Sequence, residues 1–129
     1  MTATQIILYA ILAFAGFVFV RRWLLMRGMN QYSPAQVADL MKGIDAKVLL
    51  DVRTAGERQR QHIKGSLHIP LHELGRRMDE LGKHKNKEVI CYCQSGNRSI
   101  SAAARLKKHG FTVANMKGGM AEWNSSGLR

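Results

Sequence analysis

The chain has 129 residues, of which 20 are Lys or Arg and 9 are Asp or Glu, so its formal net charge is +11. This length allows one domain with an appendage, and the charge suits a membrane surface, small anions or nucleic acid. No stripe of basic and aromatic residues accompanies the charge, which argues against nucleic acid, and the two cysteines and five histidines lack metal-ligand spacing, so we expect neither a metal nor a cofactor.

The first predicted element is a long apolar helix. Residues 2–20 carry no charged side chain, and as a helix they would rise about 28 Å, close to the roughly 30 Å hydrocarbon core of a bilayer. We therefore expect residues 1–31 to be a transmembrane anchor with a short tether, in which residues 4–20 contact membrane lipid. A cleaved secretory signal fits less well, because its positive charge precedes the apolar region.

The charges that flank this helix predict its orientation. Arg21, Arg22 and Arg27 follow the apolar run, and no side-chain cation precedes it. Because basic residues favour the cytoplasmic side, we expect a single pass through a bacterial-type inner membrane, with the amino terminus outside. The rest of the chain, residues 32–129, would then be a cytoplasmic domain.

Helices and strands are predicted to alternate through residues 32–129. The helices are marked by apolar residues at helical spacing and by caps such as Ser33 with Pro34, and the strands by short apolar runs. The predicted helices cover residues 34–43, 54–61, 71–82, 99–109 and a last turn after Gly118-Gly119, and the predicted strands cover residues 47–52, 67–69, 89–92 and 112–115.

This alternation predicts an α/β fold, in which a small parallel sheet has helices on both faces. In such sheets, sites form at the carboxyl ends of the strands. Asp51, Arg53 and Cys93 all lie at such ends, so we expect them to lie near one another.

The loop after the third predicted strand is the strongest candidate for a site. Cys93 ends the strand, Gly96 allows a tight turn, and Arg98 precedes the predicted helix. Unpaired backbone N–H groups at a helix start and a nearby guanidinium both favour a thiolate over a thiol. The alternative is that Cys93 is a buried apolar residue, but the polar residues that follow it are atypical of a core strand.

The segment Cys-Gln-Ser-Gly-Asn-Arg-Ser, residues 93–99, resembles the active-site loop of rhodanese sulfurtransferases. The resemblance extends over roughly residues 32–124, and three other stretches resemble the family in the same order. They are Leu50-Asp51-Val52-Arg53 with Glu57, then His62-Ile63-Lys64-Gly65-Ser66-Leu67-His68-Ile69-Pro70, and Lys117-Gly118-Gly119-Met120-Ala121-Glu122-Trp123.

The resemblance implies a small rhodanese-like domain in which Cys93 is the catalytic nucleophile and carries sulfur as a persulfide. It implies a small anionic sulfur donor such as thiosulfate, which Arg98 would guide, and a thiol or cyanide as acceptor. Asp51 and Arg53 correspond to a pair that supports the loop. The residues expected to bind the substrate or the persulfide are Gln94, Ser95, Gly96, Asn97, Arg98 and Ser99.

Two alternatives remain open from the sequence. Four residues separate Cys93 from Arg98, whereas phosphatases and arsenate reductases that resemble this family have one more, so the shorter loop favours sulfur transfer. The other alternative is a membrane-tethered interaction module that binds a membrane protein, with secondary or no turnover. Glu57 is expected to organise the connection after the first domain strand, and Cys91 to be a buried strand residue.

Overall fold

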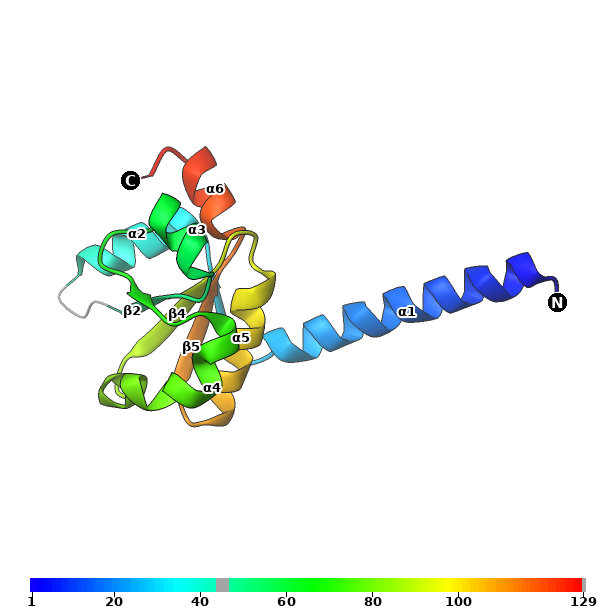
Figure 1. The fold of residues 1–129 in the computed structure, drawn as a ribbon, viewed down its shortest axis with the longest axis horizontal. Coiled ribbons are helices and arrows are strands. Elements are labelled where there is room, and N and C mark those ends of the chain that lie inside the picture. The colour runs from blue at the N-terminus through cyan, green and yellow to red at the C-terminus, as the bar shows by residue number, and fades with distance from the viewer. Residues whose placement is uncertain (44–46, 129) are drawn as a thin grey trace.

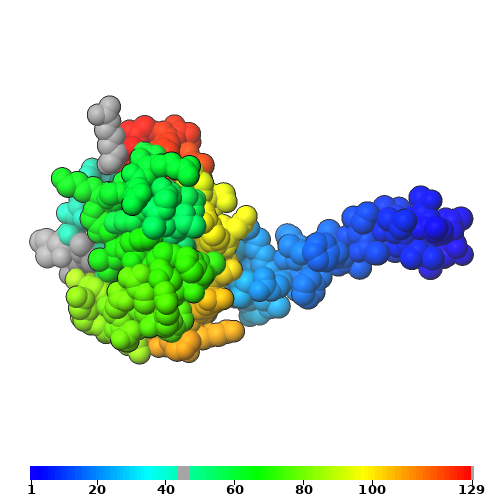
Figure 2. Space-filling view, in the orientation of Figure 1, coloured from blue at the N-terminus to red at the C-terminus, as the bar shows by residue number. Residues whose placement is uncertain are grey.

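A computed structural model describes residues 1–43 and 47–128 of the chain (Figure 1). The long helix α1 (Ala3–Met26) extends away from an α/β domain, and only its last turns lie against that domain. The space-filling view shows the same arrangement, with the blue α1 projecting from the domain beside its yellow segment (Figure 2). The expected end of the domain, Arg129, lies outside the described residues.

The domain is built on a sheet of five parallel strands, in the order β1-β5-β4-β2-β3. The predicted fold class is therefore confirmed. The strands are β1 (Asn30–Tyr32), β2 (Val48–Asp51), β3 (Leu67–His68), β4 (Glu88–Tyr92) and β5 (Thr112–Met116).

Helices cover both faces of the sheet (Figure 1). Successive side chains of β4 point to opposite faces, so that Val89, Cys91 and Cys93 belong to one apolar cluster and Ile90 and Tyr92 to the other. The first cluster packs under α5 (Asn97–Lys108), α4 (Leu74–Arg77) and the 3₁₀ helices η1 (Leu71–Glu73) and η2 (Met78–His84), and the second under α2 (Pro34–Lys42) and α6 (Gly119–Ser125).

Two predicted elements differ from the structure. Residues 30 and 31, expected in a tether, belong to β1, which pairs with β5 at the sheet edge; three polar residues show no alternation, and tertiary pairing alone makes them a strand. The single helix expected over residues 71–82 is divided into η1, α4 and η2. None of its short segments has a side-chain cap hydrogen bond.

Two chain turns position the site. Thr54 caps α3 (Ala55–Arg60) by a capping box with Glu57, in which the Thr54 hydroxyl accepts from the Glu57 amide. Gly96, at a φ of 103°, turns the chain from the Cys93 loop into α5. This left-handed conformation is unstrained only for glycine, and it starts α5 at Asn97, two residues before the predicted Ser99.

Candidate functional site

Cys93 is the first residue after β4, and the loop that leads into α5 closes over it. Its side chain is 0% exposed. The backbone amide of Gly96 donates to Sγ at 3.0 Å, and the Ser99 hydroxyl lies 3.4 Å from the same sulfur. A donor must therefore approach across the exposed rim of the loop, which consists of Gln94, Ser95 and Asn97.

The surroundings of Cys93 favour its thiolate. Burial opposes ionisation, but hydrogen bonds from the Ser99 hydroxyl and from the amides of Ser99, Gly96 and Ser95 outweigh it and hold the pKa of Cys93 below its usual range. The neighbouring thiol behaves in the opposite way, because burial and the charge of Cys93 raise the pKa of Cys91 to about 12. Of the two free thiols, Cys93 is the one whose surroundings favour ionisation.

A chain of polar side chains lies behind the sulfur. The Ser99 hydroxyl donates to Asn115 Oδ1 at 2.5 Å, and Asn115 Nδ2 donates to Gln31 Oε1 at 2.9 Å. Ser99 is fully buried and its one hydroxyl proton goes to Asn115 here, so the hydroxyl can donate to a Cys93 thiolate only by turning away from Asn115 Oδ1. Asn115 lies on β5 and shows no signal of this role in the sequence.

Replacing Ser99 with alanine is expected to raise the pKa of Cys93. The thiolate loses a hydrogen bond while its burial remains, so the pH at which alkylation reaches half its maximal rate should move upward. The measurement is iodoacetamide alkylation as a function of pH, with Ser101→Ala in the same helix as control. An unchanged profile for Ser99→Ala would contradict the role of this hydroxyl.

The other side of the loop rests on the start of α6. The amide of Met120 donates to the Cys93 carbonyl at 2.8 Å, and the amide of Ala121 donates to the Gln94 carbonyl at 3.1 Å. A Cβ on Gly119 would lie 2.3 Å from the Cys93 carbonyl oxygen. Gly119 thus permits the backbone of the two segments to meet, which the glycine pair in the sequence indicated only as a turn.

Arg98 does not project freely from the loop. Its two terminal nitrogens donate to the two carboxylate oxygens of Glu57, at 2.7 and 2.8 Å. These bonds, followed by smaller contributions from Thr54, lower the pKa of Glu57 to about 2, so the carboxylate is charged throughout the physiological range. Glu57 thus joins the cap of α3 to the loop arginine.

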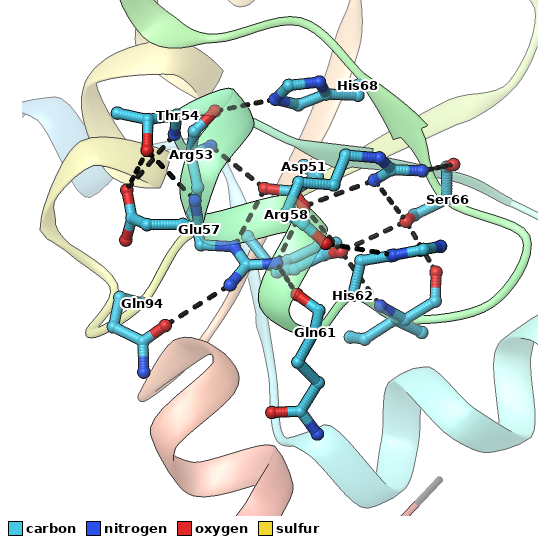
Figure 3. A network of polar contacts seen from close by, with 12 residues as sticks. Asp51, Arg53, Thr54, Glu57, Arg58, Gln61, His62, Ser66, His68 and Gln94 are labelled. Carbon is cyan, nitrogen blue, oxygen red and sulfur yellow. Dashed lines mark hydrogen bonds and ion pairs between the residues drawn. The ribbon is translucent and has the colours of Figure 1, made fainter.

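Asp51 and Arg53 form a buried network beside the loop (Figure 3). Arg53 donates from Nε and Nη2 to the two Asp51 oxygens, and the carboxylate also accepts from Arg58 and from the Tyr92 hydroxyl. Burial opposes the charge of Asp51, but the bonds from Arg53 and Tyr92 outweigh it and lower its pKa. The Asp51 carboxylate is thus fully engaged in hydrogen bonds from Arg53, Arg58 and Tyr92.

The network reaches the loop through one contact. Arg53 Nη1 donates to Gln94 Oε1 at 3.4 Å (Figure 3). The predicted site residues are therefore arranged in two sets, with Gly96 and Ser99 against the sulfur and Asp51 and Arg53 supporting the loop from outside. Within the described residues, no group of three His, Cys, Asp or Glu side chains is placed to hold a metal.

Comparison with known proteins agrees with this geometry. A family model described as Rhodanese-like domain matches residues 33–126. A protein of Allochromatium vinosum named Sulfurtransferase is 32% identical over 101 residues, which cover 78% of this chain and 92% of the relative. The Bacillus subtilis protein YrkF is 45% identical over 76 residues, but the chain spans only 40% of its length.

Solved structures share the fold. A thiosulfate sulfurtransferase from Pseudomonas aeruginosa has a TM-score of 0.72 at 28% identity, with 82% of this chain and 21% of that chain covered. A rhodanese-related protein from Thermoplasma volcanium has a TM-score of 0.71 at 28% identity, with 78% and 95% covered. Relatives thus include both proteins of similar length and much longer chains.

Proposed function

Because this chain belongs to the rhodanese-like domain family, we propose that it is a membrane-anchored sulfurtransferase that moves sulfane sulfur through a persulfide on Cys93. The observation that carries the proposal is a buried cysteine whose sulfur accepts from the Gly96 amide and contacts Ser99, in a loop of backbone donors. Such a cradle stabilises a thiolate and, equally, the terminal anionic sulfur of a persulfide. Sulfur transfer in general accords with the names of the relatives.

The proposed reaction has two steps. The Cys93 thiolate attacks the outer sulfur of a thiosulfate-type donor, a new S–S bond forms, and sulfite leaves with the electron pair of the broken bond. A thiophilic acceptor such as cyanide or a thiolate then attacks the outer sulfur of the persulfide. With cyanide, thiocyanate forms and the Cys93 thiolate is restored. Both steps conserve charge and need neither a metal nor a redox cofactor.

The loop dimensions support this proposal over phosphate chemistry. The Gly96 amide lies 3.0 Å from Sγ, so the loop is closed around a single sulfur atom. A tetrahedral oxyanion would need donors to four separate atoms and a wider loop. The experiment is a parallel assay of the purified chain for sulfur transfer from thiosulfate to cyanide and for hydrolysis of an aryl phosphate. Thiocyanate formation is expected, and phosphatase turnover alone would overturn the proposal.

A pure interaction module is the alternative of another class. It would need no acidified thiol, yet the pKa of Cys93 is lowered against the effect of burial. A second, binding role toward a membrane protein is compatible with turnover. The parallel assay separates these functions, since a module without turnover would form neither thiocyanate nor free phosphate.

Helix α1 supports the anchor. It has 24 residues, it is the one helix in the described part of the chain that is long and apolar enough to cross a bilayer, and none of its residues is buried. A signal sequence has the same length and composition. The arginines that follow the apolar run favour the anchor, because a signal carries its cations before that run.

The end of α1 contacts the domain next to the candidate site. Arg22 donates to Asn97 of the Cys93 loop, Lys107 of α5 donates to the Arg27 carbonyl at 2.9 Å, and Leu25 packs against the first core cluster. Through these contacts, the end of α1 packs directly against the domain. If α1 spans the membrane, the loop lies close to the headgroup layer.

We expect the amino terminus outside an inner membrane and Cys93 in the cytoplasm, because Arg21, Arg22 and Arg27 favour the cytoplasmic side. The test fuses a reporter that is active only in the cytoplasm to the carboxyl terminus. We expect the reporter to be active and the fusion protein to stay in the membrane fraction after a salt wash. If the cytoplasmic reporter is silent and a periplasmic reporter is active, the predicted orientation is wrong. If the full-length protein is found in the soluble fraction, α1 is not a membrane anchor.

A further inference from the structure

An ion pair of two side chains lies at the mouth of the Cys93 loop, where Arg22 also donates to Asn97 of the rim. Arg98, in the first turn of α5, is 36% exposed, and Glu57, on α3, is 23% exposed, so both face the solvent from which a donor comes. Their two parallel hydrogen bonds, at 2.7 and 2.8 Å, join the guanidinium to the carboxylate edge to edge. The exposed rim of the loop otherwise consists of the uncharged Gln94, Ser95 and Asn97.

Glu57 is held in place from its other side. Its Oε1 accepts from the backbone amide and from the hydroxyl of Thr54, both at 3.1 Å, as part of the capping box of α3. The carboxylate is therefore a fixed partner, since leaving Arg98 would also break the cap of a helix. An anionic donor that approaches Arg98 meets a guanidinium whose charge is compensated and two of whose five N–H donors are bound to Glu57.

We propose that Glu57 is a specificity-determining residue, which neutralises Arg98 and thereby makes the site prefer singly charged or neutral sulfur donors to the dianion thiosulfate. This inference rests on the proposed sulfur transfer through Cys93. The preferred class is that of persulfides of thiol compounds or proteins, in which the outer sulfur carries at most one charge. Thiosulfate remains a substrate, but one that the mouth of the loop binds weakly.

The physical reason is the dependence of attraction on donor charge. Removing the carboxylate raises the net charge at the mouth by one unit, and Coulomb energy scales with the charge of the donor, so a dianion gains twice what a monoanion gains. Glutamine is the matched substitution at this position. Its amide oxygen can still accept from Thr54 and from one Arg98 nitrogen, so the cap and the place of Arg98 are kept while the charge is lost.

The experiment compares two donors of the same sulfur chemistry in the full-length protein. Thiosulfate is a dianion, and methanethiosulfonate is a monoanion that leaves as sulfinate where thiosulfate leaves as sulfite. For Glu57→Gln we expect the KM for thiosulfate to fall about tenfold, the KM for methanethiosulfonate to fall about threefold, and kcat to change little. Added salt should reduce the fall in KM for thiosulfate more than the fall in KM for methanethiosulfonate.

Two further variants keep the test decisive. Glu73→Gln removes a carboxylate that pairs with Arg76 and Arg77 away from the loop, and it should leave the ratio of the two KM values unchanged. Arg98→Gln leaves Glu57 uncompensated and should shift the ratio in the opposite direction, against thiosulfate. Arg98→Gln therefore tests the same proposal independently if Glu57→Gln does not fold.

The outcomes separate this proposal from the one on which it rests. An equal change of both KM values in Glu57→Gln and in Arg98→Gln would show a purely structural role for Glu57 and overturn the inference. A wild-type chain that transfers sulfur from neither donor would overturn the proposed function, and this inference with it.

Discussion

Replacing Cys93 with serine is expected to lower the rate of sulfur transfer by at least about a thousandfold. A serine hydroxyl fits the same cradle, but it is not ionised by the hydrogen bonds that lower the pKa of the Cys93 thiol. It also forms no persulfide. The measurement is thiocyanate formation from thiosulfate and cyanide by the wild type and the variant.

The matched control is Cys91→Ala. Cys91 belongs to the same apolar cluster and is as buried as Cys93, but its pKa is raised to about 12, so it carries no reactive thiolate. We expect this variant to keep its activity and to lose on the order of 1 kcal/mol of stability through a small cavity. Full activity in Cys93→Ser would show that Cys93 is not the reactive thiol. Loss of activity in a folded Cys91→Ala variant would assign that role to Cys91.

Replacing Asp51 with asparagine should have the largest effect on stability. The Asp51 carboxylate is 0% exposed and Arg53 is 2% exposed, and their side chains are 2.9 Å apart. Breaking a buried ion pair from one side leaves the other charge uncompensated, so we expect the free energy of unfolding at pH 7 to fall by about 3–5 kcal/mol. The measurement is urea unfolding, with Asp79→Asn, an exposed aspartate on η2, as control.

The pH dependence of this difference has a defined sign. The pKa of Asp51 is lower in the folded chain than its usual value, so the folded state favours the charged form. Its contribution is fully present above the unfolded pKa of about 3.9 and is lost as the pH falls through the folded pKa. The difference in free energy of unfolding between wild type and Asp51→Asn should therefore narrow below about pH 4. The stabilising role of the Asp51 charge would be contradicted if the two free energies of unfolding differed by less than about 1 kcal/mol at pH 7, or if their difference did not narrow at low pH.

Much of the sheet could be predicted from the sequence because its central strands are buried on both faces. Val89 to Tyr92 is a continuous apolar run, and a run of this kind has few alternatives to a central strand. The edge strand β1 has no such run, since its three polar residues become a strand only by pairing with β5. Local sequence does not encode that pairing.

The site could be predicted only in part, for a similar reason. Cys93, Gly96 and Ser99 lie within one loop, and their chemistry follows from a strand end and a helix start that the sequence displays. The partner of Arg98 lies 41 residues away, on α3, and the hydroxyl of Ser99 is oriented by Asn115 on another strand. Such contacts depend on how the elements pack, and no local motif announces them.

The persulfide mechanism requires that Cys93 hold the transferred sulfur atom. Intact-mass analysis of the full-length protein after incubation with thiosulfate should show a gain of about 32 daltons, the mass of one sulfur atom, and peptide mapping should place it on Cys93. Cyanide should remove the added mass, and Cys93→Ser should never acquire it. A mass gain on Cys91, or an unmodified Cys93 in a chain that still produces thiocyanate, would contradict the persulfide mechanism.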